Sequence, residues 1–585
     1  MTATHWTNQV SANFNTASDW NTGAVPGASD DAILDAPGST NYTVAVTTSE
    51  TVSSIQTAST ATLTIGGAAA VFTAANGTGS GANAGVIEVN DHGTLALGGA
   101  VDNTGSIVIH SGGDLTKLVV QPAGLTLSGH GQVNLTGNNN EIIGGAAAPT
   151  LTNVDNLIQG QGIIAELKLV NEAAGVIDAT GATEALTINK GTLTNSGLIE
   201  ATGAAGLAIK SSKVTDSTGG ILSAGAGSKI VLSHSTVVGG ILETSGTGVI
   251  EATGLGNVLR GGPSLVANKG LLEVANASSL ELIGTLSNKA TVSLLGSTGF
   301  SDLVVGATGA TLQGGGKLVL NNGTEDRVYG VASNATLTNV DNEITGSGLI
   351  GDGKLTLVNQ GSIVGDGTGV LTVDTGASAI TNTGLIQAGA SGDVVVKSAV
   401  TNSGTLSAAG GTLTLDGAVS GSGAATIDGG VLDAASSFNE NVSFTGSTGV
   451  LELSQSQSYA GSVTGLSLAG TSSLDLLDIG FVSGSTTATY ADNGHGTGGV
   501  LTVTDGTKTS KINLVGNYTS STFVAADDGH GGTTVHDPSA LAAQANRFVA
   551  AMSAFTSDRG ASSFIIDALP APAQSLLATP MIAHR

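Results

Sequence analysis

Thr150 to Ile164 read TLTNVDNLIQGQGII, and Thr336 to Ile350 read TLTNVDNEITGSGLI. Similar segments precede both copies, TLSGHGQVNL at 126–135 and TLQGGGKLVL at 311–320. The residues that persist between the copies are Leu, Val, Ile, Gly and Asn, whereas the positions between them differ freely. A chain with this pattern repeats one structural unit, so we interpret the motif as scaffolding rather than as a duplicated site.

Short strands and turns fill the region around the two copies. Segments such as ATLTI at 61–65 and KIVLS at 229–233 alternate apolar and polar side chains, which is the pattern of half-buried β-strands. The turns contain Asn, a small residue, Gly and an aliphatic residue, as in TNSGLI from Thr194. Equivalent Asn residues in these turns, such as Asn171 and Asn195, recur at intervals of roughly 22 residues, a spacing typical of solenoid repeats.

A period of this length with Asn or Gly at a fixed corner predicts an all-β fold, a parallel β-helix solenoid. Each coil lays its strands on those of the previous coil at a spacing of about 4.8 Å. Corner Asn residues stack into a ladder of side-chain amides, and Asn and Gly tolerate the left-handed backbone of tight corners. We predict a right-handed solenoid, since parallel crossovers are right-handed by default. We expect Asp155 and Asp341, inside the two motifs, to form corner or turn hydrogen bonds.

Changes in sequence texture divide the chain into four parts. Residues 1–48 form an N-terminal capping segment, and residues 49–454 form the β-helix repeats. We expect residues 455–536 to form a β-rich C-terminal domain with longer strands and hairpin-like turns, and residues 537–585 to form an amphipathic helix and a flexible tail. With about 22 residues per coil, the repeats give about 18 coils and a rod on the order of 85 Å long.

The terminal helix is predicted from its cap and its periodicity. Asp537 suits the N-cap, and Pro538 suits the first helical position. Five apolar residues then recur at spacings of three and four: Leu541, Ala545, Phe548, Met552 and Phe555. This spacing places them on one face of a helix.

Both tryptophans of the chain, Trp6 and Trp20, lie in the N-terminal segment. A solenoid needs a terminal cap because its last coil exposes an apolar face, and we favour this role for the two indoles. The alternative is that exposed Trp rings bind a ligand by stacking on sugars.

Composition restricts the partners. The net charge is −26, so the surface repels nucleic acid phosphates and anionic lipid, and we expect no nucleic acid partner. The chain has no cysteine, which excludes disulfides and thiolate metal sites. No apolar run approaches the length of a transmembrane helix, and the opening stretch MTATHWTNQVSANFN lacks the pattern of a secretory signal peptide.

The motifs TLTNVDNxIxGxGxI and TNSGxI resemble the β-helix repeats of large secreted bacterial surface proteins, the autotransporter-like and filamentous-adhesin-like group. The segment from Tyr459 to Val535 and the following ANRFVAAMSAF are similar to the ends of proteins exported by type I secretion. Two features of such proteins are absent from this sequence, the GGxGxDxUx calcium repeats and a C-terminal outer-membrane barrel. The resemblance implies export through separate machinery, with the signal in residues 537–585, and a secreted, extracellular or cell-surface location.

Catalytic chemistry has a single candidate cluster, NNGTEDRVYG, which contains Glu325, Asp326, Arg327 and Tyr329. Such residues are able to serve acid–base chemistry on an anionic sugar, as in polysaccharide-active enzymes on β-helices. The alternative is a solvated corner loop, which we favour, so we assign no catalytic residue. We treat the four residues, together with Trp6 and Trp20, as candidate binding residues.

No cofactor is predicted, and calcium is the one metal that the sequence suggests. Asp527 and Asp528 lie in a Gly- and His-rich terminal loop, and oxygen ligands alone suit calcium. A solvated turn is the commoner structure for such a loop.

We therefore predict an exported, non-catalytic structural or adhesin-like surface protein whose rod displays binding faces to an extracellular polysaccharide or protein. One alternative is a polysaccharide-active lyase, hydrolase or depolymerase on the same fold. The other is a component that self-associates into a surface layer or filament.

Overall fold

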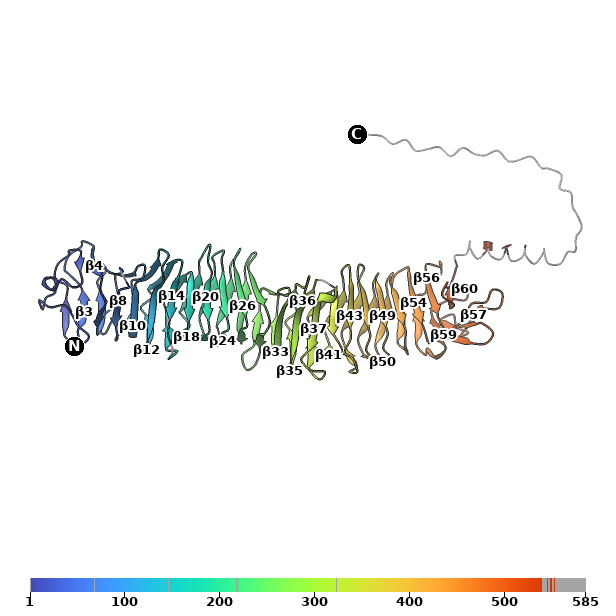
Figure 1. Ribbon diagram of the computed structural model, residues 1–585. Coiled ribbons are helices and arrows are strands. Elements are labelled where there is room, and N and C mark those ends of the chain that lie inside the picture. The colour runs from blue at the N-terminus through green and yellow to red at the C-terminus, as the bar shows by residue number, and fades with distance from the viewer. Residues whose placement is uncertain are drawn as a thin grey trace, which may run out of the picture.

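The computed structural model describes residues 2–538, apart from 68, 146, 217, 218 and 322, and also 544, 545, 548, 549 and 552. These residues form one elongated rod (Figure 1), with the N-terminus at one end and β57 to β60 near the other. The fold is a parallel β-solenoid of about 19 coils, and 54% of the chain is strand. This confirms the predicted fold class, while the right-handed sense of winding stays a prediction.

Most coils contribute three short strands, each of which pairs in parallel with its equivalent in the next coil. One coil consists of β15 (Thr150–Asn153), β16 (Leu157–Gly160) and β17 (Gly162–Ala165). The next consists of β18 (Lys168–Asn171), β19 (Val176–Ala179) and β20 (Leu186–Asn189). Their three parallel pairings stack Leu151 on Leu169, Ile158 on Ile177 and Ile164 on Ile188. These side chains are buried, so aliphatic columns form the core along the rod.

Side-chain amides form the predicted ladder along one corner. Asn153 donates from Nδ2 to Oδ1 of Asn171 at 3.0 Å, and Asn171 donates to Asn195 at 2.9 Å. Asn195 then donates to a carboxylate oxygen of Asp216 at 2.9 Å, where this network ends. A second network repeats the arrangement from Asn268 through Asn288, Asn342, Asn339, Asn359 and Asn382 to Asn402. The ladder therefore satisfies buried polar groups that would otherwise destabilise the corner.

The LTNVDN motif connects the ladder across a coil that has glycine in place of Asn at this corner, in the segment SGHG at 128–131. Asn156 accepts from Asn103 at 2.7 Å, although 53 residues separate them. The coil between them turns through glycines, and a Cβ on Gly131 would lie 2.6 Å from Nδ2 of Asn103. Asn153 and Asn156 are joined to each other by backbone-to-side-chain hydrogen bonds of 2.9 and 3.0 Å. Glycine is thus required at this corner, because a larger side chain would block the hydrogen bond between Asn103 and Asn156.

The two aspartates of the motif form turn hydrogen bonds, as predicted. Asp155 accepts the backbone N–H of His130 at 3.0 Å and the side chain of Asn156 at 3.2 Å. Asp341 accepts the N–H of Gly315 at 3.0 Å in the second copy. Both carboxylates therefore hold the glycine-rich turn of the preceding coil.

The tryptophans close the N-terminal end of the core. Trp6 and Trp20 are 1% and 2% exposed, and their ring centroids lie 5.0 Å apart in an edge-to-face arrangement. Phe14 lies 5.0 Å from Trp20 and 5.5 Å from Phe72, which belongs to a later coil. The Trp20 indole also donates to the carbonyl of Phe14 at 2.8 Å. The cluster thus covers the first apolar layer of the solenoid.

The C-terminal β-rich segment is hydrogen-bonded to the last coil. Its strands are β55 (Ser462–Thr464), β56 (Ser472–Leu476), β57 (Thr487–Asp492), β58 (Gly498–Thr504), β59 (Thr509–Val515), β60 (Val524–Asp527) and β61 (Thr533–His536). β55 and β56 continue the parallel stack, and β59 adds to β55 in parallel. β57 to β59 form an antiparallel meander, while β61 joins β56 and β60 in antiparallel pairings. The segment therefore covers the C-terminal end of the rod.

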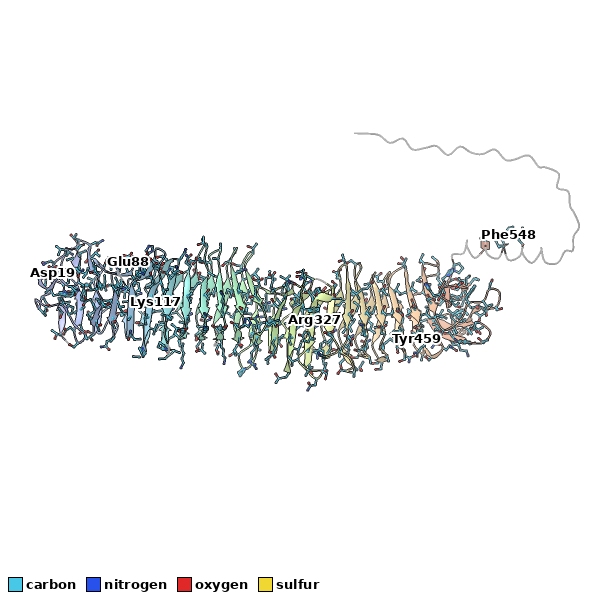
Figure 2. All side chains as sticks on the ribbon, viewed as in Figure 1. Asp19, Glu88, Lys117, Arg327, Tyr459 and Phe548 are labelled. Carbon is cyan, nitrogen blue, oxygen red and sulfur yellow. The ribbon has the colours of Figure 1, made fainter. Side chains whose placement is uncertain are left out.

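The predicted terminal helix and tail lie almost entirely outside the described residues. Gln544, Ala545, Phe548, Val549 and Met552 have helical backbone, and their side chains are exposed (Figure 2 labels Phe548). The helix is not confirmed by these five residues alone. Asp537, proposed as its N-cap, is buried and accepts the backbone N–H of Thr522 at 3.0 Å.

Candidate functional site

The predicted cluster around Arg327 is divided between the inside and the outside of the rod. β37 (Asp326–Gly330) alternates, so Asp326 points inward and Arg327 and Tyr329 point outward. Asp326 is fully buried and accepts the backbone N–H of Gly296 at 2.6 Å. Glu325 is half-buried in the preceding 3₁₀ turn, η2 (Gly323–Glu325). Of the four residues, Arg327 and Tyr329 alone form a common outer surface.

Arg327 forms an ion pair with Asp352 at 3.6 Å, but its main partner, shared with Tyr329, is Asp302. It lies directly across from Arg327 in β35 (Ser301–Gln313), and the guanidinium binds it through Nε at 2.8 Å and a second nitrogen at 2.9 Å. These hydrogen bonds raise the pKa of Arg327 above its usual range, against the effect of burial. Phe300 lies against the guanidinium, with 3.7 Å from Cζ to the ring centroid. Tyr329 also donates to Asp302 at 3.3 Å. The sequence analysis did not find Asp302, because this residue lies 25 positions before Arg327, in the preceding coil.

Trp6 and Trp20, the other candidate binding residues, lie inside the N-terminal cap. Neither indole face is on the surface in this structure. Sugar stacking on these rings would require the cap to open.

Asp527 is the last residue of β60, and Asp528 begins the turn that follows. Asp527 is exposed and accepts the N–H of Gly529 at 3.0 Å, whereas Asp528 accepts those of His530 and Gly532 at 2.6 and 2.9 Å. Burial raises the pKa of Asp528, but the hydrogen bonds it accepts from the backbone have a larger combined effect in the opposite direction. The pKa of Asp528 is therefore below its ordinary value. Within the described residues, no three His, Cys, Asp or Glu side chains gather as a metal-ligand set.

A column of carboxylates near these residues was not predicted. Asp433 in β52 (Val431–Ala434), Glu452 in β54 (Gly449–Leu453) and Asp475 in β56 lie directly across from one another. Burial raises the pKa of each, and repulsion from its acidic neighbours raises it further. The column follows from the pairing register, since each member belongs to a different coil and no motif in the sequence joins them.

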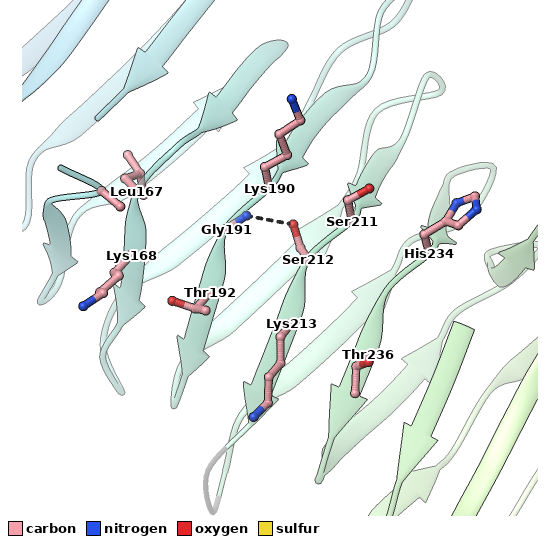
Figure 3. Close-up of a pocket in the computed structure, with 11 residues that line it drawn as sticks. Leu167, Lys168, Lys190, Gly191, Thr192, Ser211, Ser212, Lys213, His234 and Thr236 are labelled. Atoms are coloured by element: carbon pink, nitrogen blue, oxygen red, sulfur yellow. Dashed lines mark hydrogen bonds between the residues drawn. The ribbon is translucent and has the colours of Figure 1, made fainter. Parts of the chain in front are cut away.

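A basic groove lies on the first half of the rod (Figure 3). It is a shallow cavity of about 540 Å³, and its lining includes Lys168, Lys190, Lys213, His234, Thr192 and Thr236. Lys168 and Lys213 project in the same direction from parallel strands, with Thr192 on the strand between them. We call the surface formed by these six residues the lysine groove.

Buried hydroxyl groups hold the corner behind the lysine groove. Gly191 donates its N–H to Oγ of Ser212 at 3.3 Å, and Ser212 donates its N–H to Oγ of Ser235 at 3.2 Å. Ser235 in turn donates its N–H to Oδ1 of Asn257 at 3.2 Å. Lys190 and His234 extend from this corner with positive φ angles of 51° and 50°. These hydrogen bonds therefore fix the backbone from which Lys190 and His234 extend into the lysine groove.

No protein-family model matches the chain, and no curated protein matches its sequence. Among the described residues, no helix is long and apolar enough to cross a membrane. The functional argument therefore depends on the geometry of the rod and its surfaces.

Proposed function

We propose that the protein is an exported, non-catalytic structural or adhesin-like rod of the cell surface or extracellular space. The observation that carries this proposal is the division between its invariant and variable positions. Core and ladder residues repeat from coil to coil, whereas outward side chains in the two copies differ, as Lys168 and Thr356 do. A rod of this kind presents different side chains along its length at fixed spacing of about 4.8 Å per coil.

The polar cluster around Arg327 supports binding rather than bond cleavage. General acid–base hydrolysis needs two carboxyl groups free to exchange protons with substrate and water. Here the Asp302 carboxylate is held by both guanidinium hydrogen bonds, and Asp326 is buried under the strand. Phe300 and Tyr329 beside them provide partly exposed rings on which a sugar is able to stack.

Binding and cleavage are separated by presenting the purified chain to an array of extracellular polysaccharides and matrix proteins. We expect retention of at least one ligand class by the folded chain, with no new reducing ends after prolonged incubation. Release of reducing ends or unsaturated sugars would instead establish the polysaccharide-active alternative. In that case, Asp302→Asn should lower the cleavage rate, because it removes the carboxylate paired with Arg327.

Export is tested on the C-terminal residues. Deletion of residues 537–585 is expected to move the protein from the culture medium to the cell interior, because the proposed type I signal lies there. The measurement is immunoblotting of medium and cells for the full-length and shortened chains. A second shortened chain also carries Asp216→Asn, a substitution expected to stabilise the coils. If this chain also stays in the cells, the loss from the medium is a loss of export and not of stability. Unchanged amounts in the medium would refute the export role of this segment.

A further inference from the structure

We propose that the lysine groove is a binding site for a short acidic oligosaccharide, one that carries uronate carboxylates among neutral hydroxyl groups. The proposal concerns the same rod as the proposed function, and it rests on that function only for the extracellular origin of the ligand. The site was not apparent in the sequence, because Lys168 and Lys213 belong to separate segments with another coil between them. Two coil steps bring them to about 10 Å from each other along the axis.

The charges of these lysines are not matched by acidic neighbours, unlike those of Lys117, Lys229 and Lys317. Lys117 and Lys317 lie directly across from Glu141 and Glu343, and they form ion pairs at 3.8 and 3.0 Å. By contrast, the cross-strand neighbours of Lys168 are Thr150 and Thr192, and those of Lys213 are Thr192 and Thr236. Within the described part of the chain, no carboxylate lies within 4.0 Å of Lys168, Lys190 or Lys213.

The second copy of the repeat indicates that the fold does not need these lysines. Lys168 lies three residues before the ladder residue Asn171, and the equivalent position before Asn359 is Thr356. Lys213 lies three residues before Asp216, and the equivalent position before Asn402 is Ala399. Because the same coils form with Thr and Ala there, the coil does not require a lysine at either position, and both cations are free to bind a ligand.

The lining and the overall charge define the ligand. The side chains between the cations are Thr192 and Thr236, which are suited to hydrogen bonds with sugar hydroxyl groups, and lysine ammonium groups bind carboxylates. The net charge of −26 opposes a long, densely charged polymer such as nucleic acid. A short ligand with few charges and many hydroxyl groups satisfies both conditions.

The test uses the purified full-length chain and calorimetric titration with a hexamer of galacturonic acid. We expect binding that weakens as salt is added, and about a tenfold or greater rise in Kd for the variant Lys168→Thr/Lys213→Ala. The control variant Lys269→Thr/Lys289→Ala makes the same charge change at exposed turns outside the lysine groove, and it should bind like the wild type. Circular dichroism should show the same folded signal for all three chains.

Three further ligands test whether the lysine groove recognises uronate carboxylates in particular. The methyl-esterified hexamer, which lacks the charges, should bind at least about tenfold more weakly. Inorganic phosphate and a short single-stranded DNA should not compete at equal charge concentration. The inference is overturned if the hexamer does not bind, if the groove and control variants lose affinity equally, or if DNA or phosphate binds as tightly as the uronate. None of these results bears on export or on polysaccharide cleavage, so the proposed function is judged separately.

Discussion

Replacing Asp216 with Asn should stabilise the coils around it by roughly 4 kcal/mol above pH 7, and by much less near pH 4. Asp216 is 1% exposed, and burial raises its pKa from 3.8 to about 7, although the hydrogen bond from Asn195 lowers it. The folded state thus holds the proton more tightly than the unfolded state does. Stability from this group is complete below pH 3.8 and is lost as the pH rises through about 7.

Geometry explains why an amide fits this position better than a carboxylate. Asn195 donates from Nδ2 to the carbonyl of Ile221 in the next coil at 3.3 Å, and the equivalent carbonyl for Asp216 is that of Ile241. Oδ2 of Asp216 is buried and has no hydrogen-bond partner among the described residues. An amide nitrogen placed there would donate to this carbonyl, whereas an ionised oxygen is repelled by it.

The measurement is hydrogen exchange in the coils from 192 to 253, together with urea unfolding, at pH 4.5 and pH 8. The matched control is Glu184→Gln, which removes one charge from an exposed loop and should change stability by less than about 0.5 kcal/mol. Asp433, Glu452 and Asp475 also make stability depend on pH, but they do so equally in both proteins. Their effect cancels when the variant is compared with the wild type at each pH. A gain of the same size at both pH values would contradict the argument, as would no gain at pH 8.

Replacing Asn171 with Leu should destabilise the first network by about 3 kcal/mol, because the change leaves several buried polar groups unpaired. The Asn171 amide lies within hydrogen-bonding distance of the carbonyls of Gly175 and Leu198 and of Oδ1 of Asn195, at 2.9 to 3.2 Å. It also accepts from Asn153. Leucine has the same branched shape and is larger than asparagine, so the change leaves no cavity and the loss reports the broken hydrogen bonds.

The effect of Asn171→Leu should be confined to its own end of the rod. In a solenoid each coil contacts its neighbours, so exchange should accelerate over residues 150–216 and remain unchanged over residues 336–402. The control Thr194→Val alters an outward side chain of the adjacent coil and should change stability by less than about 0.5 kcal/mol. Uniform acceleration along the whole rod, or protection equal to the wild type, would show that the ladder does not stabilise individual coils.

The features that repeat along the chain were predictable, because each is visible in one stretch of sequence. The spacing of the corner Asn residues predicted the solenoid and the amide ladder, and the motif itself predicted the turn role of Asp155 and Asp341. The burial of Trp6 and Trp20 followed from the need to cover the first coil.

Surfaces that depend on register were not predictable in the same way. The sequence separation between ladder residues is 18 from Asn153 to Asn171 but 24 from Asn171 to Asn195, so coil length is not constant. The cross-strand partner of a given outward residue therefore cannot be counted along the chain. This is why the pairing of Asp302 with Arg327 and the approach of Lys168 to Lys213 emerge only once the strands are aligned.

The amide ladder is also a directional sequence of connectors. Where two Asn residues pair between successive coils, the oxygen faces the N-terminal neighbour and the hydrogen faces the C-terminal one, as in Asn359 between Asn339 and Asn382. A whole coil with its own corner Asn, inserted between two such residues, would accept a hydrogen bond from one and donate to the other. The rod is therefore extensible at these positions. Ionised Asp216 has no hydrogen to donate to the next coil, so the first network ends at this residue. The ladder of the first copy therefore stops at Asp216, whereas the second copy has Asn402 at the equivalent position.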